Sequence, residues 1–282
     1  MEVILARTAG FCMGVDLALR RLDKLVASAG GRSIHILGPI IHNPQVLARY
    51  AEQGVRIAGS PAEVPDGAYA VIRAHGIPRE TERELRDRDV IIKDATCPRV
   101  KKAQLLIARH TAKGEVLLLY GEADHPEVRG LVSYAGNGHH VFGSAEDFAR
   151  LVLKSGISYV LAAQTTQDRG AFEAMAEGLK ADPAIDVVVL HTICDATRLR
   201  QAETSQLAET VDFMVVVGGL NSGNTRRLAQ VAAERGTPSV HVETAADLDV
   251  DSLRGYGRVG VTAGASTPRA LIDEVLRVLK GV

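Results

Sequence analysis

The chain has 282 residues, of which 46% are hydrophobic and 24% charged, so its composition is that of a folded globular protein rather than a disordered one. This length exceeds one ordinary domain of roughly 100–150 residues and favours two or three compact units. Lys and Arg number 33 against 34 Asp and Glu, a formal net charge of −1, which excludes an overall basic field for holding nucleic acid or an anionic membrane. No apolar run approaches the ~18 residues of a membrane span, and the first residues lack a signal-peptide pattern. We therefore expect a cytoplasmic protein with neither nucleic acid nor a membrane as its partner.

Short β-branched runs alternate with amphipathic stretches along almost the whole chain, which predicts an α/β fold. Runs such as 116–120 and 213–218 are apolar throughout, a pattern typical of parallel strands that are buried on both faces. Between the strands lie helical patterns, among them 13–25, 98–110 and 195–207. The predicted strands are, in chain order, 3–6, 33–37, 69–74, 90–94, 116–120, 140–142, 159–163, 187–192, 213–218, 240–243 and 258–263.

Three kinds of strand-end loop each occur three times in the same cyclic order, which indicates three similar α/β units. The first kind follows a glycine, at 38, 121 and 219; the second lies at 73–76, 163–166 and 263–266; the third carries the cysteines. We predict three small parallel-sheet α/β domains in a pseudo-threefold trefoil around a central cavity. The expected segments are an N-terminal strand and first cysteine loop at 1–13, which pack with the last unit, and domains at 14–97, 98–193 and 194–282.

The cysteines are the most informative residues. Cys12, Cys97 and Cys194 each stand directly before a predicted helix, whose N-terminus stabilises a thiolate. Their odd number and wide spacing argue against a disulfide framework, and a structural zinc site takes four ligands. An iron–sulfur cluster with three thiolate ligands and one open iron fits this pattern better. A catalytic zinc site with three thiolates and a water is the alternative.

Histidines in the other strand-end loops suit an anion. Each lies near the start of a predicted helix, where free N–H groups and the helix dipole favour a phosphate. They are His42, His75 and His125. No glycine-rich loop ending in Gly-Lys-Ser/Thr occurs in the sequence, which argues against nucleotide hydrolysis.

The third unit offers hydroxyl and amide groups in place of histidine. The segment before a predicted helix provides the Ser222 and Asn224 side chains and the Gly223 backbone, and Ser266 repeats the arrangement in a later loop. Glu127 follows His125 and Pro126 at the second position of another predicted helix. We expect this carboxylate to be the proton source of the site.

Eight ordered motifs, spread over about residues 5–270, resemble the 4-hydroxy-3-methylbut-2-enyl diphosphate reductase family. They are Ala9-Gly-Phe-Cys-Met-Gly-Val, Gly38-Pro-Ile-Ile-His-Asn-Pro, Arg73-Ala-His-Gly, Asp94-Ala-Thr-Cys-Pro, His125-Pro-Glu-Val, Gln164-Thr-Thr, Asn221-Ser-Gly-Asn-Thr and Thr262-Ala-Gly-Ala-Ser. The resemblance implies a trefoil fold and the reductive dehydroxylation of (E)-4-hydroxy-3-methylbut-2-enyl diphosphate to isopentenyl diphosphate and dimethylallyl diphosphate. This is the last step of the non-mevalonate isoprenoid pathway.

The resemblance also implies the role of each site residue. One [4Fe-4S] cluster would be held by Cys12, Cys97 and Cys194. Its open fourth iron would bind the substrate hydroxyl, and loss of that iron would leave a [3Fe-4S] cluster. Thr165 would lie near that hydroxyl, and Glu127 would be the proton donor. The residues implied to hold the diphosphate are His42, His75, His125, Ser222, Asn224 and Ser266, with a backbone contact alone from Gly223.

Two other functions are compatible with three thiolates: a lyase that uses the open iron without net electron transfer, and an iron or redox sensor. The histidine and Asn-Ser-Gly-Asn loops have no purpose in a sensor and favour an enzyme. A reductase needs electrons, and no dinucleotide fingerprint follows any predicted strand. We therefore expect an electron donor such as ferredoxin or flavodoxin, with Arg99, Lys101 and Lys102 as candidate docking cations.

Overall fold

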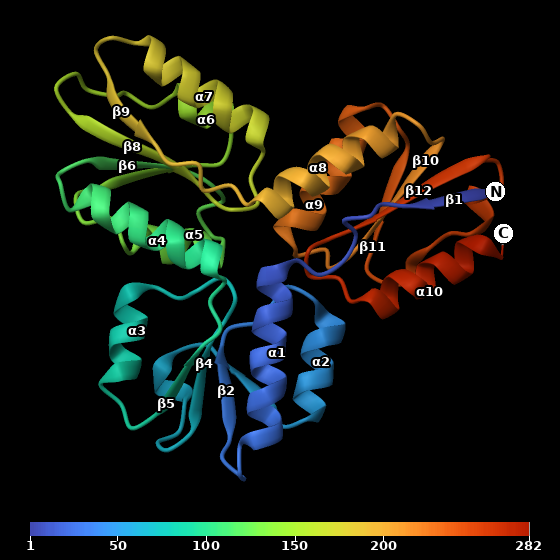
Figure 1. Cartoon of the computed structure of the whole chain (residues 1–282), viewed down its shortest axis with the longest axis horizontal. Helices are drawn as coiled ribbons and strands as arrows, with labels where there is room; N and C mark the ends of the chain where they lie inside the picture. The colour runs from blue at the N-terminus through green and yellow to red at the C-terminus, as the bar shows by residue number, and fades with distance from the viewer. Residues whose placement is uncertain (282) are drawn as a thin grey trace. The chain divides into compact units, whose positions relative to one another are not determined.

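The structure, a computed structural model, describes residues 1–281, so Val282, the last residue of the predicted segment 194–282, lies outside the described residues. The chain forms two compact units (Figure 1). Unit 1 comprises Met1–Asp16, Ile41–Arg49 and Asp195–Val282, and unit 2 comprises Leu17–Ile40 and Tyr50–Cys194. Together they contain three four-stranded sheets, each of which is parallel throughout.

The sheet of unit 1 includes strands from both ends of the chain. Alternate side chains of β10 face opposite sides, as the pleat of a strand requires. Met214 packs with Ala208 of α8 and Ala232 of α9, whereas Val215 and Val217 pack with the apolar face of α10. The elements of this sheet and its cover are β1 (Glu2–Leu5), α8 (Asp195–Ala208), β10 (Phe213–Val217), α9 (Gly223–Glu234), β11 (Ser239–Val242), η2 (Ala245–Asp247), η3 (Asp251–Leu253), β12 (Arg258–Ala263) and α10 (Arg269–Lys280).

The first sheet of unit 2 follows helix α1, whose apolar positions repeat at helical spacing. Leu19 and Leu22 of α1 are buried, and so are Ile36 of β2 and Val71 of β4. On the β strands, Leu37 and Ile72 belong to a second cluster with Leu85 of α3. The elements of this part of the chain are α1 (Met13–Ser28), β2 (Ile34–Leu37), α2 (Pro44–Glu52), β3 (Val55–Ala58), η1 (Pro61–Glu63), β4 (Tyr69–Ile72), α3 (Arg79–Arg86) and β5 (Ile91–Asp94). Of these, α1 up to Asp16 and α2 up to Arg49 belong to unit 1.

The second sheet of unit 2 has helices on both faces. Leu118 packs with Phe172 of α7, whereas its neighbours Leu117 and Leu119 pack with Ile107 of α4. These three leucines are fully buried, and burial of such a side chain contributes roughly 1.5–3 kcal/mol. The elements are α4 (Pro98–Thr111), β6 (Val116–Tyr120), α5 (Pro126–Val132), β7 (His139–Phe142), α6 (Ala145–Ala149), β8 (Ser158–Ala163), α7 (Arg169–Ala181) and β9 (Asp186–Val189).

The three sheets share one topology. Their strand orders are β3-β2-β4-β5, β7-β6-β8-β9 and β11-β10-β12-β1. In each sheet, the first and third strands lie side by side in the centre, and the second and fourth strands lie at the edges. The N-terminal strand β1 supplies the fourth strand of the last sheet through its parallel pairing with β12. The predicted α/β class and the three similar parallel sheets are confirmed.

The structure contains one strand that the sequence analysis did not predict. β3 (Val55–Ala58) lies at a sheet edge, and its middle residues Arg56 and Ile57 are exposed. Because Arg56 interrupts its apolar residues, β3 lacks the continuous apolar pattern of β6 and β10. Over residues 1–281, no helix combines the length and the apolar character that crossing a bilayer requires.

Candidate functional site

The residues singled out in the sequence lie after the carboxyl ends of the strands, either in the loops or in the first turn of the helix that follows. In an open parallel sheet, ligands bind at this end, where adjacent strands send their connections to opposite faces. In the present topology these adjacent pairs are β2 and β4, β6 and β8, and β10 and β12. The loops after these six strands contain His42, His75, His125, Thr165, Ser222 and Ser266.

Each cysteine follows the fourth strand of its sheet and directly precedes a helix. Cys12 precedes α1, Cys97 precedes α4 and Cys194 precedes α8. All three are half-buried and free of disulfide bonds. In addition, the Sγ of Cys12 lies 3.5 Å from the backbone N–H of Val15 in the first turn of α1. Cysteine sulfurs are the usual ligands of iron–sulfur clusters in proteins, so each residue suits iron coordination.

In unit 2, backbone hydrogen bonds tie the two cysteine loops to the neighbouring strand ends. The Cys97 N–H donates to the carbonyl of Ala74, next to His75, over 2.9 Å. The Cys194 N–H donates to the carbonyl of Thr165 over 3.0 Å. Gly76 completes the first of these loops with a φ of 72°, a conformation that side-chain-bearing residues rarely adopt. The cysteines are thus held to residues of the candidate substrate loops.

Glu127 and Thr165 form a buried pair in unit 2. The Glu127 carboxylate accepts the Thr165 backbone N–H over 2.7 Å and the Thr165 hydroxyl over 2.9 Å. Burial raises the pKa of Glu127, while the two hydrogen bonds from Thr165 oppose this effect. The net direction is upward, so Glu127 retains a proton at a higher pH than an exposed glutamate does. This residue can therefore hold a proton for a reaction.

His125 precedes Glu127 and caps the same helix, α5. Its Nδ1 accepts the backbone N–H of Glu127 over 3.1 Å, which in the neutral ring leaves the proton on Nε2. The rings of His75 and His125 meet edge to face with centroids 5.4 Å apart. Unit 2 therefore places two predicted phosphate-binding histidines next to each other and next to the predicted proton donor.

In unit 1, Ser266 connects the other predicted substrate residues. Its hydroxyl donates to the backbone carbonyl of His42 over 3.2 Å and lies 3.5 Å from the hydroxyl of Ser222. The loop that contains Ser266 also contacts the first cysteine, because the Cys12 N–H donates to the carbonyl of Ala265 over 3.2 Å. Gly264 in this loop leaves room for Thr225, whose hydroxyl a Cβ at position 264 would strike.

Asn224 lies at the start of α9, and the hydrogen-bonding groups of its side chain are not satisfied by the described residues. It is 5% exposed, and neither its amide oxygen nor its amide nitrogen has a hydrogen-bond partner among the described residues. Ser222 caps this helix by accepting the Thr225 N–H, and Gly223 is the first helical residue. A buried amide without a partner at a helix N-terminus indicates a polar ligand group, and an anion fits these donors.

A second network, which the sequence analysis missed, holds the loop before Cys12. The Glu203 carboxylate accepts the N–H groups of Arg7 and Thr8 and the Thr8 hydroxyl, over 2.7, 2.8 and 2.6 Å. The buried Arg200 donates to the carbonyls of Thr8 and Gly10, the shortest contacts being 2.6 and 2.7 Å. Both side chains come from α8, far away in sequence, so no local pattern signals them.

Arg73 is a further residue to which the sequence analysis assigned no role, although it begins one of the motifs. Burial lowers the pKa of Arg73 to about 10, and the positive charge of Arg129 adds to this effect. Its Nε donates to the carbonyl of Gly76 over 3.3 Å. Arg73 therefore shapes the loop that carries His75.

The structure distributes the twelve predicted site residues equally between the units, and within each unit contacts link most of them. Unit 1 contains Cys12, His42, Ser222, Gly223, Asn224 and Ser266, and unit 2 contains His75, Cys97, His125, Glu127, Thr165 and Cys194. Their assigned roles stay predictions, as does the division into domains.

Comparison with known proteins identifies the family of the chain. The profile of the LytB protein family matches residues 3–280. The chain belongs to this family. A 4-hydroxy-3-methylbut-2-enyl diphosphate reductase of Nitratidesulfovibrio vulgaris (strain DP4) is 56% identical, with 100% of both chains covered. The protein of the same name in Geobacter sulfurreducens is 44% identical and covers 98% of this chain and 96% of its own.

Solved structures lead to the same family. The E-1-hydroxy-2-methyl-but-2-enyl-4-diphosphate reductase of Plasmodium falciparum has a TM-score of 0.93 at 26% identity, covering 99% of this chain and 88% of that one. A second structure, of (E)-4-hydroxy-3-methyl-but-2-enyl diphosphate reductase, described as the terminal enzyme of the non-mevalonate pathway, has a TM-score of 0.70 at 37% identity, with 100% of both chains covered. The predicted family resemblance, and with it an oxidoreductase of this family, is confirmed. An iron–sulfur cofactor is general to LytB proteins.

Proposed function

We propose that this chain reduces (E)-4-hydroxy-3-methylbut-2-enyl diphosphate to isopentenyl diphosphate and dimethylallyl diphosphate. The observation that carries the proposal is the buried Glu127–Thr165 pair. The backbone carbonyl of Thr165 also accepts the N–H of Cys194. This arrangement joins a carboxyl group of raised pKa, a hydroxyl and a thiol in one strand-end region of unit 2. The identity of 56% to a relative named as this reductase supports the same substrate.

The residues that would ligate the iron–sulfur cluster are Cys12, Cys97 and Cys194, which form no disulfide bonds, are half-buried and directly precede helices. When bound, a [4Fe-4S] cluster with three thiolate ligands would supply single electrons and a Lewis-acidic open iron for the substrate hydroxyl. The chain contributes fixed ligand loops, because backbone hydrogen bonds from all three cysteines anchor them to neighbouring loops.

The diphosphate would be held by neutral donors rather than by a cluster of cations. Ser222, Ser266 and Asn224 are 5%, 6% and 5% exposed, and their hydroxyl and amide groups gain strength where water is excluded. His42, His75 and His125 would add ring N–H donors, the Nε2 proton of His125 being fixed by the contact at Nδ1. Gly223 would contribute its backbone N–H at the start of α9.

Glu127 would provide a proton through Thr165. In the structure the Thr165 hydroxyl donates to the carboxylate over 2.9 Å. Once the carboxyl is protonated, this hydrogen bond would reverse: the carboxyl O–H would donate to the Thr165 oxygen and leave the threonine proton available for the departing substrate oxygen. The overall reaction breaks the allylic C–O bond and forms a C–H bond. It consumes two electrons and two protons and releases one water.

The experiment that tests this function is turnover of the purified substrate by anaerobically prepared protein with a supplied reductant. We expect both five-carbon diphosphates as products, with Mössbauer and EPR signals of an iron–sulfur cluster that change when substrate is added. A colourless protein that contains zinc would overturn the proposal. Turnover without any reductant would favour the lyase instead.

The electron donor and the location belong to the same proposal. No dinucleotide fingerprint follows a strand, so a ferredoxin or flavodoxin would deliver the electrons. The cytoplasmic location stays a prediction from the sequence.

A further inference from the structure

Helix α4 lines a groove in unit 2 that begins beside Cys97. The groove has a volume of about 580 Å³ and includes Pro98, Lys101, Lys102, Leu105 and Arg109 of α4. These positions recur at intervals of three and four residues, so they lie on one face of the helix. Thr96, on the other side of Cys97, lines the groove as well.

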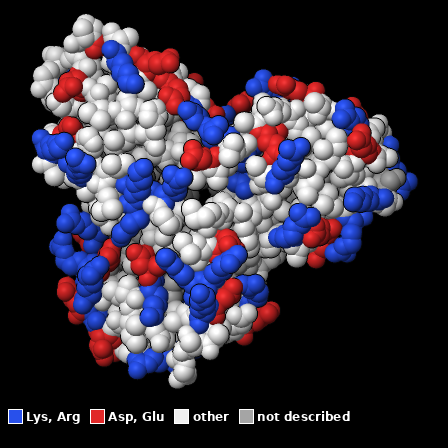
Figure 2. Space-filling view, in the orientation of Figure 1, with Lys and Arg blue, Asp and Glu red and all other residues white. Residues whose placement is uncertain are grey.

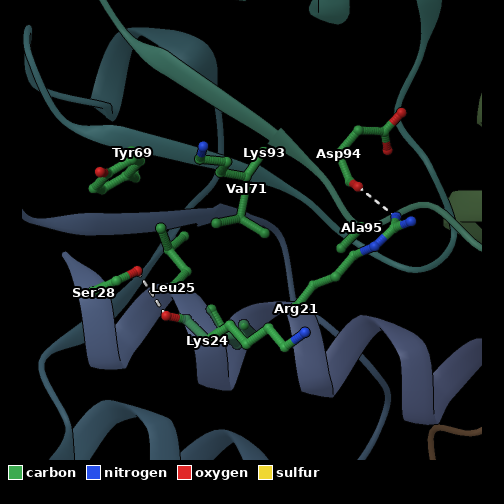
Figure 3. Close-up of a pocket in the computed structure, with 10 residues that line it drawn as sticks. Arg21, Lys24, Leu25, Ser28, Tyr69, Val71, Lys93, Asp94 and Ala95 are labelled. Atoms are coloured by element: carbon green, nitrogen blue, oxygen red, sulfur yellow. Dashed lines mark hydrogen bonds between the residues drawn. The ribbon is translucent and has the colours of Figure 1, made fainter.

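A second hollow of about 370 Å³ continues this surface between α1 and β5. The two hollows share Arg21 and Asp94, and the second adds Lys24 of α1 and Lys93 of β5, with the apolar side chain of Leu25 between them (Figure 3). Arg21 spans the junction, because its guanidinium donates to the Asp94 carbonyl over 2.7 Å. We call the combined surface the α4–α1 surface.

The α4–α1 surface is strongly basic in a chain of net charge −1. Its two hollows contain six cations and one acidic residue, Asp94. That acid is already engaged, since its carboxylate lies 3.7 Å from the Lys101 ammonium. Lys and Arg side chains gather over α1 and α4 on the face drawn in Figure 2. The cations that line the two hollows are Arg21, Lys24, Lys93, Lys101, Lys102 and Arg109.

The middle of the α4 face is apolar. Leu105 is 60% exposed, although the same helix buries Ile107 completely. An exposed leucine among cations has the arrangement of a protein interface, in which an apolar contact is surrounded by charged residues. A small anion would need the cations alone, whereas Leu105 requires a partner with a complementary apolar patch.

We infer that the α4–α1 surface binds a small acidic one-electron carrier protein. This inference rests on the proposed function, which requires two successive single electrons from outside the chain. Two molecules of reduced carrier are oxidised for each substrate reduced, and two protons are taken up. Thr96 and Pro98 line the groove and flank Cys97 in the chain, so a carrier seated there contacts the residues on both sides of a proposed cluster ligand.

The structure revises the docking cations expected from the sequence. Lys101 and Lys102 line the groove, but Arg99 belongs to neither hollow. Lys101 is also partly neutralised by Glu82, whose carboxylate lies 3.7 Å from its ammonium. Lys102 and Arg109, both exposed, are therefore the better positions for a test.

The test uses the cluster-loaded full chain and measures its Kd for an acidic ferredoxin, with a flavodoxin in a parallel series. The variant Lys102→Glu/Arg109→Glu should weaken binding at least about tenfold at low salt and flatten the dependence of Kd on salt. Leu105→Ala should weaken binding without changing that salt dependence. Turnover driven by reduced methyl viologen, which needs no docking, should remain within about twofold of wild type for all variants.

Matched controls in unit 2 carry the same changes outside the two hollows. Arg150→Glu/Lys154→Glu alters the net charge equally, and Val152→Ala shortens a side chain that is 86% exposed. If the charge controls weaken carrier binding equally, or if the α4 variants leave binding unaltered, the inference that the α4–α1 surface binds the carrier is wrong. Binding of flavodoxin alone would still support the surface and would identify the carrier as a flavoprotein. Absence of viologen turnover in the wild type would refute the proposed function, while the Kd series still decides the docking surface.

Discussion

Thr165 donates both its backbone N–H and its hydroxyl to the carboxylate of Glu127. The two donors engage different oxygens, so they fix the plane of the carboxyl group as well as its position. The pair is fully enclosed, with Glu127 2% and Thr165 6% exposed. A proton on Glu127 is thus shielded from bulk water, and the Thr165 hydroxyl is the hydrogen-bonded group through which this proton can be transferred.

The first prediction concerns this proton. Glu127→Gln preserves the shape of the side chain and can still accept the Thr165 N–H, but it cannot release a proton. We expect kcat to fall by about 10²–10³ while the iron content stays at the wild-type level, since loss of a general acid typically costs 10²–10⁴. Steady-state turnover and iron analysis on the same sample measure the two effects.

Thr165 provides the matched control. Thr165→Ser retains the hydroxyl and should keep most activity, whereas Thr165→Val removes it and should approach the loss seen in Glu127→Gln. Both retain the backbone donor to Glu127. Equal activity of the serine and valine variants would exclude the hydroxyl from the proton path.

The second prediction concerns pH and follows from the raised pKa of Glu127. Above the ordinary glutamate pKa of ~4.3 the unfolded chain releases this proton while the folded chain keeps it. The folded state then binds more protons, so the contribution of Glu127 to stability falls with rising pH until its folded pKa is passed. Urea unfolding of the apoprotein should give a stability difference between Glu127→Gln and wild type that grows in favour of the variant between pH 5 and 8. A constant difference across that range would contradict a raised pKa.

Most strands were predictable because their residues carry their own burial pattern. β6 and β10 are apolar at nearly every position, and both are buried on two faces. β3 has the opposite character: Ile57 is 52% exposed at the edge of its sheet. Its position depends on pairing with β2 rather than on its own hydrophobic pattern, and such a strand is not distinguishable from a loop in the sequence.

Some residues of the candidate site were likewise predictable from local sequence, and others were not. Cys97, His125 and Glu127 were found because a proline directly after Cys97 or His125 marks the start of a helix. Glu203 and Arg200 were not found, because their partners are about 190 residues earlier in the chain. The sequence of α8 alone is that of an ordinary helix with polar residues. Only tertiary structure reveals that two of these residues hold the loop before Cys12.

The third prediction concerns Asn224, whose amide is buried without a partner in the described part of the chain. Replacing such a group by an apolar one of similar size is nearly neutral or stabilising. The free energy of unfolding of the Asn224→Leu apoprotein should therefore lie within about 1 kcal/mol of the wild-type value or above it. If Asn224 holds the diphosphate, KM should rise at least about tenfold, as expected from loss of a hydrogen bond to a charged group.

Gln230→Leu, an amide replaced at an exposed position of the same helix, is the control for Asn224→Leu. It should leave KM unchanged. A large loss of stability in Asn224→Leu with no change in KM would assign a structural role to this residue and remove it from the substrate site.

The last prediction tests whether α8 positions the first cysteine. Arg200→Met removes a buried donor from the carbonyls of Thr8 and Gly10, and an unsatisfied buried group costs about 1–3 kcal/mol. Glu203 would remain, and its bonds from Thr8 and Arg7 would hold one side of the loop alone. We expect urea unfolding of the apoprotein at lower denaturant, together with a several-fold faster alkylation of Cys12 measured by mass spectrometry.

The cysteines themselves separate positioning from general loss of structure. Cys97 and Cys194 lie in loops held by other contacts, so their alkylation rates should stay at the wild-type level in Arg200→Met. Arg254→Met, which alters an ion-paired arginine that is 71% exposed in the same unit, should change neither rate nor stability. Arg200→Lys should fall between wild type and Arg200→Met, because a lysine keeps the charge but cannot span two carbonyls with a planar fork. Faster alkylation of all three cysteines would mean that the whole fold opens, and α8 would then have no specific role in presenting Cys12.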